Sequence, residues 1–470
     1  MCEDVVGDCN RLTSRNSRRR STPIYAINRI CYKQGFSKAT DIRDGQLITS
    51  KVVDMTRPKW LLICLMLLLL VAWSFRDYAA LWLGRWRPPP ANVLLSSVSR
   101  QGGWTMWRGD AQRTGVQPLP GTPVRGRMVW QFATGAGMIS SPVVAGDSLF
   151  VGDTEGRLYR LRRRDGSLFW RRQGLGPIDS SPALAGELLY LGLRDGRLLA
   201  IQAADGHTRW SMATGNPIFS SPLVHAGVVY VGSGDGFLYA LDAASGVQRW
   251  RTPTQGWVTS SAALLDDMLY VGSSDGRLYF IDRHSGVPRW TYRTPKAIST
   301  TPAIAAGMVF FGGEDRWFRA IDAKEMGTRW VYTWRWLHSA FFIWGVAGPL
   351  PQLPGFRWHF RADAPIVASA AVAHGMVYLA SKSGTLSALD LHTGTPRWSF
   401  QAGAELYASP VLAGDALYVA SYDHTLNVLD AHDGTQRWRF TAGGPIHASP
   451  VVSDGEVYVA AMDGTISALR

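Results

Sequence analysis

From residue 138 to the end of the chain, short alternating runs of apolar and polar residues are separated by glycine-containing turns. The segment GVVYVGSGDGFLYALDAASGVQRW (227–250) has apolar runs at 228–232 and 237–242 and a third through Trp250, with turns at 234–236 and at Ser245-Gly246. Period-two alternation bounded by such turns predicts antiparallel strands. Together with the run that follows the preceding Ser-Ser-Pro, each unit is predicted to hold four short strands.

This unit recurs with a period of 40 residues. A Ser-Ser-Pro triplet or a near variant begins at Ser140, Ser180, Ser220, Ser260, Thr300, Ala368, Ala408 and Ala448. A tryptophan stands thirty residues after every start except the last. Four strands in about 40 residues is the size of one propeller blade, and repeat periods outrank local motifs as evidence. The pattern therefore predicts an all-β, eight-bladed β-propeller of four-stranded antiparallel blades.

The two ends of the repeat array are predicted to pair with each other. The last period ends at Arg470 after three strands, whereas Trp130 precedes Ser140 by the same ten residues that separate Trp170 from Ser180. We therefore expect the strand of Trp130 to complete the last blade, because an open propeller would leave strand edges unpaired. The tryptophans predicted to dock between blades are Trp130, Trp170, Trp210, Trp250, Trp290, Trp330, Trp358, Trp398 and Trp438.

The period is interrupted once, by an insertion at residues 331–357 that lengthens the fifth unit from 40 to 68 residues. It is rich in large aromatic residues: Trp334, Trp336, Phe341, Phe342 and Trp344. The segment is too short to cross a bilayer twice. We expect an exposed aromatic projection that contacts the membrane or a partner protein. The alternative is a segment that folds back over the rim of the propeller.

The N-terminal quarter differs in character from the repeats. Residues 59–78 contain an uncharged run from Trp60 to Phe75, whose 16 residues would span about 24 Å as a helix. This run predicts a single transmembrane anchor, preceded by a disordered or mis-called tail (1–58, with Met55 as an alternative start) and followed by a linker (79–103) and the propeller (104–470). A cleaved signal peptide is the alternative, but no small-residue cleavage site follows the run.

Charge and cysteine content narrow the class of protein. Of the net charge of +13, residues 1–58 contribute +5 (11 Lys/Arg, 6 Asp/Glu) and residues 59–100 contribute +4 (5 and 1). The repeats have no polybasic stripe, which argues against nucleic-acid binding. All four cysteines precede residue 65, so the propeller has neither a disulfide nor a thiolate metal site. Its histidines lack the spacing of metal ligands and are predicted to be solvated turn residues.

The repeat motif AxDxxSGxxxW, present as Ala240, Asp242, Ser245, Gly246 and Trp250, resembles that of the quinoprotein (PQQ-type) eight-bladed propellers. The segment WTMWRGDAQRTGV (104–116) resembles their lead-in. The resemblance covers residues 104–470, and it implies the fold rather than one activity. The family includes PQQ-dependent dehydrogenases, which bind PQQ with calcium, and BamB-like non-catalytic scaffolds. The enzymes usually carry an adjacent-cysteine disulfide and long pocket-forming inserts, and this chain lacks both features.

Propellers of this kind bind through their inter-blade loops and middle turns. The residue before each triplet varies among the repeats, and this variation on a constant frame is typical of a recognition surface. The candidate binding residues are Asp179, Arg194, Phe219, Trp257, Lys296, Glu405, Tyr407 and His447. Drift at solvated positions is one alternative. A PQQ enzyme is another, in which Trp257 would stack on the quinone and Lys296 would pair with its carboxylates.

The sequence thus favours a membrane-anchored scaffold with a protein partner, such as an envelope assembly complex. Catalytic residues, cofactor and metal are not expected. The anchor is predicted to lie in the inner membrane and the propeller in the periplasm.

Overall fold

The computed structural model describes residues 103–117, 124–324, 329–349 and 355–470, together with Leu65, Met66, Leu69 and Ala72. These four residues are helical and exposed, and the predicted tail, anchor and linker otherwise lie outside the described residues. Within the described part of the chain, no helix combines the length and the apolar character needed to span a membrane. The anchor therefore stays a prediction.

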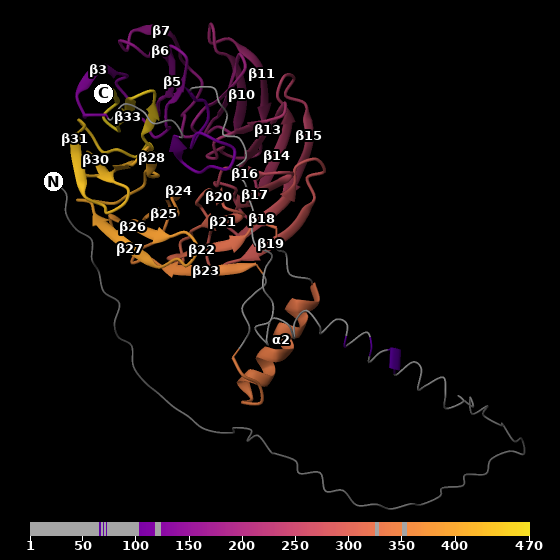
Figure 1. Cartoon of the computed structure of the whole chain (residues 1–470). Coiled ribbons are helices and arrows are strands. Elements are labelled where there is room, and N and C mark those ends of the chain that lie inside the picture. The colour runs from indigo at the N-terminus through magenta and orange to yellow at the C-terminus, as the bar shows by residue number, and fades with distance from the viewer. Residues whose placement is uncertain are drawn as a thin grey trace, which may run out of the picture. The chain divides into compact units, whose positions relative to one another are not determined.

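The repeats form eight antiparallel sheets that follow one another around a ring (Figure 1). In each blade the first strand is innermost, and the first strands of neighbouring blades contact each other at seven of the eight boundaries between blades. The strands of the first four blades are β4 (Val143–Ala145), β5 (Ser148–Gly152), β6 (Leu158–Arg162) and β7 (Leu168–Arg172); β8 (Ala183–Ala185), β9 (Leu188–Gly192), β10 (Arg197–Gln202) and β11 (Thr208–Ala213); β12 (Leu223–His225), β13 (Val228–Gly232), β14 (Phe237–Asp242) and β15 (Gln248–Pro253); β16 (Ala263–Leu265), β17 (Met268–Gly272), β18 (Arg277–Asp282) and β19 (Pro288–Arg293).

The remaining four blades have the same order. Their strands are β20 (Ala303–Ala305), β21 (Met308–Phe311), β22 (Trp317–Asp322) and β23 (Phe356–Arg361); β24 (Ala371–Ala373), β25 (Met376–Ala380), β26 (Thr385–Asp390) and β27 (Pro396–Gln401); β28 (Val411–Ala413), β29 (Ala416–Ala420), β30 (Thr425–Asp430) and β31 (Gln436–Thr441); β32 (Val451–Ser453), β33 (Glu456–Ala460), β34 (Thr465–Leu469) and β3 (Met128–Ala133). The predicted number of blades and of strands per blade is confirmed.

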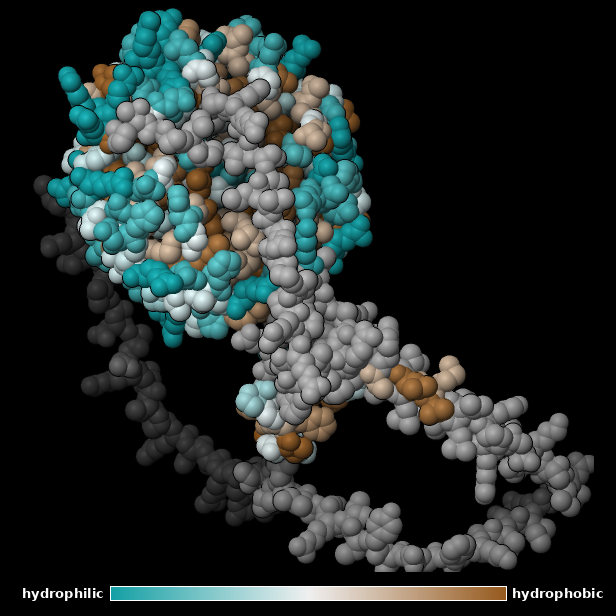
Figure 2. All heavy atoms as spheres, viewed as in Figure 1, coloured by the Kyte–Doolittle hydropathy of each residue, from teal (hydrophilic) through white to brown (hydrophobic). Residues whose placement is uncertain are grey.

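The packing of neighbouring blades against each other explains the pattern of apolar and polar residues in the repeats. The second and third strands of each blade are largely buried between neighbouring blades, whereas the fourth strand alternates exposed with partly buried positions. Hydrophilic residues accordingly cover much of the visible outer surface (Figure 2).

The ring is closed by the two ends of the repeat array, as predicted. Strand β3 pairs antiparallel with β34, with Trp130 opposite Ala468 and Ala133 opposite Thr465. Figure 1 shows β3, near the beginning of the described chain, beside the last strands. Beyond the strands, the backbones of Arg127 and Arg470 exchange two hydrogen bonds of 3.0 and 2.8 Å.

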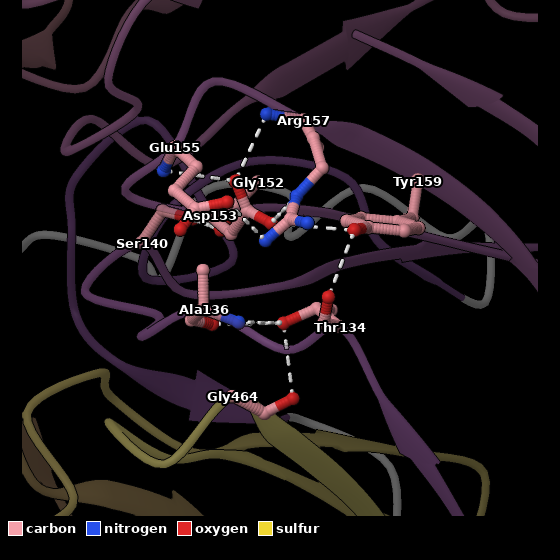
Figure 3. A network of polar contacts seen from close by, with 9 residues as sticks. All are labelled: Thr134, Ala136, Ser140, Gly152, Asp153, Glu155, Arg157, Tyr159 and Gly464. Carbon is pink, nitrogen blue, oxygen red and sulfur yellow. Dashed lines mark hydrogen bonds and ion pairs between the residues drawn. The ribbon is translucent and has the colours of Figure 1, made fainter.

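A polar network links this closure to the first blade (Figure 3). The Thr134 hydroxyl donates to the Gly464 carbonyl (3.0 Å), and the Tyr159 hydroxyl lies 3.4 Å from the Thr134 carbonyl. Tyr159 also lies 3.3 Å from the carboxylate of Asp153, which is fully buried and accepts a 2.6 Å bond from Arg157. The eighth and first blades are therefore joined by side-chain contacts as well as by the β3–β34 ladder.

Docking tryptophans join successive blades. Six of the indole N–H groups donate to a carbonyl 33 residues later, at 2.8–3.2 Å, in the pairs Trp130–Arg163, Trp170–Ala203, Trp210–Ala243, Trp250–Arg283, Trp358–Leu391 and Trp398–Ala431. Trp290 packs against Phe280, with ring centroids 4.6 Å apart. The turn glycine makes room for the ring: a Cβ at Gly246 (φ +75°) would lie 2.6 Å from Trp210. Only glycine tolerates both this contact and this φ.

The last docking site is assembled from the N-terminal segment. Trp438 has no residue 33 positions later, but a Cβ at Gly126 (φ +78°) would lie 2.6 Å from its ring. Gly126 thus occupies the place of the turn glycine in the eighth blade. The sequence prediction of closure did not include this contact.

The insertion lies elsewhere than predicted. Helix α2 (Arg329–Ile343) follows β22 directly, and the fourth strand of the fifth blade is β23, with Trp358 opposite Ala320. Trp330 therefore belongs to α2, and its assignment to the fourth strand of the fifth blade is wrong, because Trp358 holds that strand position. The fifth unit contains two Arg-Trp pairs, 329–330 and 357–358, and only one of them can occupy the fourth strand. Arg357 pairs with Asp322, as Arg249 does with Asp242 in the third blade.

Candidate binding site at the channel mouth

A closed ring of hydroxyl groups surrounds the central channel. The second residue of each triplet donates its backbone N–H to the hydroxyl of the equivalent residue in the next blade, at 2.8–3.0 Å. The eight residues are Ser141, Ser181, Ser221, Ser261, Thr301, Ser369, Ser409 and Ser449, and the last bond returns from Ser449 to Ser141. We call them the hydroxyl ring. These hydrogen bonds explain why every repeat has serine or threonine at this position.

Removal of one hydroxyl from this ring is expected to be costly. In Thr301→Val the buried N–H of Ser261 loses its acceptor, and an unsatisfied buried donor costs about 1–3 kcal/mol. The same substitution at Thr259, which also lines the channel, is expected to change stability by less than about 0.5 kcal/mol. Denaturant unfolding of the two variants measures the difference. Equal stabilities would show that the ring contributes little.

The lead-in segment 103–117 lies across the inner strands. Strand β1 (Gly103–Trp104) pairs with β4, and β2 (Val116–Gln117) lies parallel to β28. Between them, carbonyls of the segment accept bonds of 2.7–3.1 Å from the inner strands of four further blades, in the pairs Thr105–Leu184, Ala111–Leu264, Gln112–Ile304 and Thr114–Val372. We call residues 103–117 the plug.

Two fully buried arginines hold the plug in place. The guanidinium groups of Arg108 and Arg113 donate to backbone carbonyls of the plug and of inner-strand segments, namely those of Trp107, Arg113, Thr114, Pro222, Ala262, Ser369 and Ala370. Burial lowers the pKa of Arg108 to about 9 and that of Arg113 to about 10, and the carboxylate of Asp110 opposes this fall. Both remain cations at neutral pH. Sequence analysis missed their role, although RGDAQR was a polar run inside an otherwise apolar lead-in.

The plug and the hydroxyl ring border a cavity of about 220 Å³. Trp107 of the plug lines it, with the guanidinium carbons of Arg108 and Arg113 5.8 and 5.9 Å from its ring centroid. The residues that precede the triplets complete the lining, and we call them the channel mouth: Ile139, Asp179, Phe219, Thr259, Ser299, Val367, Tyr407 and His447. Four of the eight candidate binding residues thus line one cavity.

Asp179 is the only carboxylate of this lining, and only one of its two oxygens has a hydrogen-bond partner. Its side chain is 8% exposed, and Arg194 donates to Oδ2 from Nε (2.7 Å) and Nη2 (2.6 Å). Its Oδ1 is buried without a hydrogen-bond partner, as is the hydroxyl of Ser299. Such atoms are uncommon because losing water without a replacement bond costs free energy. The structure therefore pairs two residues that the sequence suggested separately, and leaves one acceptor available.

Aromatic pairs form much of the remaining mouth. Phe219 stacks with exposed Trp257 (centroids 6.5 Å apart, planes at 17°), and Tyr407 stacks with His447 (5.2 Å, 17°). Burial lowers the pKa of His447, so its ring is neutral at pH 7. The ammonium of Lys382 lies 5.2 Å from the Tyr407 ring centroid. The two other candidates, Lys296 and Glu405, are exposed and do not line the cavity.

The donor set of this cavity does not fit calcium-bound PQQ. Its one carboxylate is engaged by Arg194, and among the described residues no three His, Cys, Asp or Glu side chains cluster as metal ligands would. A volume of about 220 Å³ is also below the roughly 300–1,000 Å³ typical of small-molecule pockets.

Eight four-stranded blades, inter-blade tryptophans and a plugged channel define a propeller of the quinoprotein type. A family model described as "Outer membrane protein assembly factor BamB" matches residues 91–256, 216–297, 255–340, 355–408 and 403–470. The chain belongs to this family. A comparison with curated protein sequences gives no match.

Solved structures with this fold serve different purposes. BamB from Moraxella catarrhalis is similar with a TM-score of 0.60 and 18% identity, over 73% of this chain and 99% of that one. The quinohemoprotein alcohol dehydrogenase from Comamonas testosteroni has a TM-score of 0.63 and 14% identity, over 84% of each chain. The computationally designed Ika8 protein has a TM-score of 0.61 and 15% identity, over 73% and 99%. At these identities the likeness shows the fold alone.

Proposed function

We propose that this protein is a non-catalytic scaffold that holds a segment of a partner protein at the channel mouth. One observation carries the proposal: eight repeat-equivalent positions at the mouth hold eight different side-chain types, directly above a hydroxyl ring that is constant in chemistry. A frame that is constant while its outer positions vary is the arrangement of a recognition surface.

The lining specifies the chemistry of the bound segment. Asp179 Oδ1 needs a hydrogen-bond donor, such as an ammonium, guanidinium or amide group, and the Ser299 hydroxyl can donate or accept. The Phe219–Trp257 pair supplies an aromatic surface beside them. A cavity of about 220 Å³ has room for one side chain rather than a folded element. The proposed partner therefore inserts one donor-bearing side chain and lays apolar residues against the aromatic rim.

We further propose that the partner belongs to an envelope assembly complex and that the propeller works in the periplasm, tethered by the apolar run at residues 60–75. The family's description and the sequence of this run support that proposal.

Site-specific photocrosslinking tests the binding face. A photoreactive amino acid in place of Phe219 or Tyr407 is expected to cross-link the same partner in membranes, because both side chains line the cavity. The matched control is Phe169, a part-exposed aromatic residue on the fourth strand of the first blade, which is expected to give no such product. Mass spectrometry identifies the product.

A substitution tests the chemistry of the same site. Asp179→Asn is expected to lower the yield of the cross-linked product about tenfold, since bonds to a charged acceptor contribute about 1.5–3 kcal/mol. Asp195→Asn, in the middle turn of the same blade but outside the cavity, serves as the control. Equal yields from all positions would contradict the proposal. So would dye-linked alcohol oxidation by the purified protein with PQQ, lost with a chelator and restored by calcium.

A further inference from the structure

The end of α2 carries a continuous group of exposed apolar side chains. Phe341, Phe342, Ile343, Trp344 and Val346 are 46–82% exposed, and we call them the apolar tip. Apolar side chains gather at one end of the described insertion in Figure 2. Isolated exposed apolar residues are normal, but a contiguous patch marks a contact surface.

The backbone of the apolar tip is hydrogen-bonded within itself. Gly345 N–H donates to the Phe342 carbonyl (3.0 Å) and Val346 N–H to the Phe341 carbonyl (2.9 Å). With Gly345 at φ +71°, this is a Schellman cap, which satisfies carbonyls that a helix end otherwise leaves open. His338 Nε2 lies 2.9 Å from the Gly348 carbonyl and ties the returning chain to the helix. A tip capped in this way brings fewer unsatisfied backbone carbonyls into a low-dielectric medium than an uncapped helix end would.

The composition of the tip suits lipid better than protein. Its only polar side-chain atom is the Trp344 indole nitrogen, whereas protein interfaces carry about ten direct hydrogen bonds and about 20–30 residues on each side. Tryptophan and phenylalanine favour the bilayer interface, where the indole N–H meets polar groups. Residues 326–362 contain no Asp or Glu, while Arg329 and Arg335 precede the tip. Anionic headgroups therefore meet no acidic side chain of α2 or of the chain that follows it to β23.

We propose that the apolar tip inserts into the interfacial region of a lipid bilayer and holds the propeller at a membrane surface. Helix α2 has 15 residues, about 22 Å at 1.5 Å each, so it does not span a hydrocarbon core of about 30 Å. Interfacial segments of this type enter about 5–10 Å. The proposal is independent of the partner at the channel mouth and of the predicted anchor.

A local probe separates tip insertion from membrane binding by any other part of the chain. The four native cysteines are replaced by serine, and Trp344→Cys or Phe341→Cys is labelled with the fluorophore NBD in the full chain. The protein is added to, or reconstituted in, protein-free vesicles of phosphatidylcholine with and without phosphatidylglycerol. We expect a blue shift of NBD emission at both positions and quenching by lipids spin-labelled near the headgroup. The control is Val247→Cys, an equally apolar residue that is 65% exposed in a blade turn.

A second measurement uses unlabelled protein. Phe341→Ser combined with Trp344→Ser is expected to leave the melting temperature unchanged, because the side chains are exposed, and to lower protection of the insertion from protease on vesicles by about tenfold or more. Emission at positions 341 and 344 that matches position 247 on every vesicle would overturn the proposal. A blue shift that requires added membrane proteins would also overturn it and assign the tip to a protein contact.

Discussion

Deletion of residues 101–134 is expected to abolish the cooperative unfolding transition of the propeller and to cause aggregation. The deletion removes the plug, the ladder of five residue pairs between β3 and β34, and the Trp130 side chain that joins the eighth blade to the first. Loss of a buried tryptophan alone costs about 3–5 kcal/mol, and domains are typically stable by only about 5–15 kcal/mol. The exposed edge of β34 would in addition offer a template for association.

Calorimetry and size-exclusion chromatography of the deleted and intact chains measure this outcome. Met128→Ser is the control, because this residue lies in the same strand with its side chain 51% exposed, and its effect is expected to stay within about 0.5 kcal/mol. A deleted chain that melts at the same temperature and with the same cooperativity would show that β3 does not close the ring.

Replacement of Trp358 by alanine is expected to lower the free energy of unfolding by about 3–5 kcal/mol. The ring is 6% exposed, its N–H donates to the Leu391 carbonyl at 2.9 Å, and a Cβ at Gly394 would lie 2.4 Å from it. Removal of such a tightly enclosed ring leaves a cavity that the surrounding side chains fill only partly. Denaturant unfolding with a constant m-value measures the change.

Trp330→Ala is the matched control, since its Arg-Trp pair repeats that of residues 357–358 while its backbone lies in α2. We expect this variant to lose much less stability than Trp358→Ala. The reverse order would show that residues 328–333 form the fourth strand of the fifth blade and that the insertion follows them.

The choice between these two tryptophans shows where sequence reasoning ends. Residues 320–330 keep the Ala, Asp and Trp of the repeat motif, with Glu325 and Met326 in place of Ser-Gly, and Trp330 stands at the repeat spacing, so a local pattern selects Trp330. The structure selects β23, five of whose six residues pair with β22 and whose Arg357 reaches Asp322. Both segments contain Gly-x-Arg-Trp, at 327–330 and at 355–358, and the preference depends on the whole segment between them, including the helix that residues 329–343 form.

The candidate site was predictable in position but not in chemistry. Repeat register alone places the residue before each triplet at equivalent points of the ring, which is why Asp179, Phe219, Tyr407 and His447 were found. The Asp179–Arg194 pair and the unpartnered Oδ1 depend on how closely eight loops converge. Repeat register carries no information on that distance.

The sequence by itself determined the blade, the number of blades and their closure, because strand alternation, turn glycines and the 40-residue period are local features that recur. Only the tertiary structure decided how the ring is sealed and bordered. Arg108 bonds to the carbonyl of Ser369, 261 residues away, and Gly126 packs under Trp438. The residues in these contacts are not related by the 40-residue repeat. They meet because closure of the ring places unpaired backbone carbonyls and the Trp438 indole beside the N-terminal segment of the propeller.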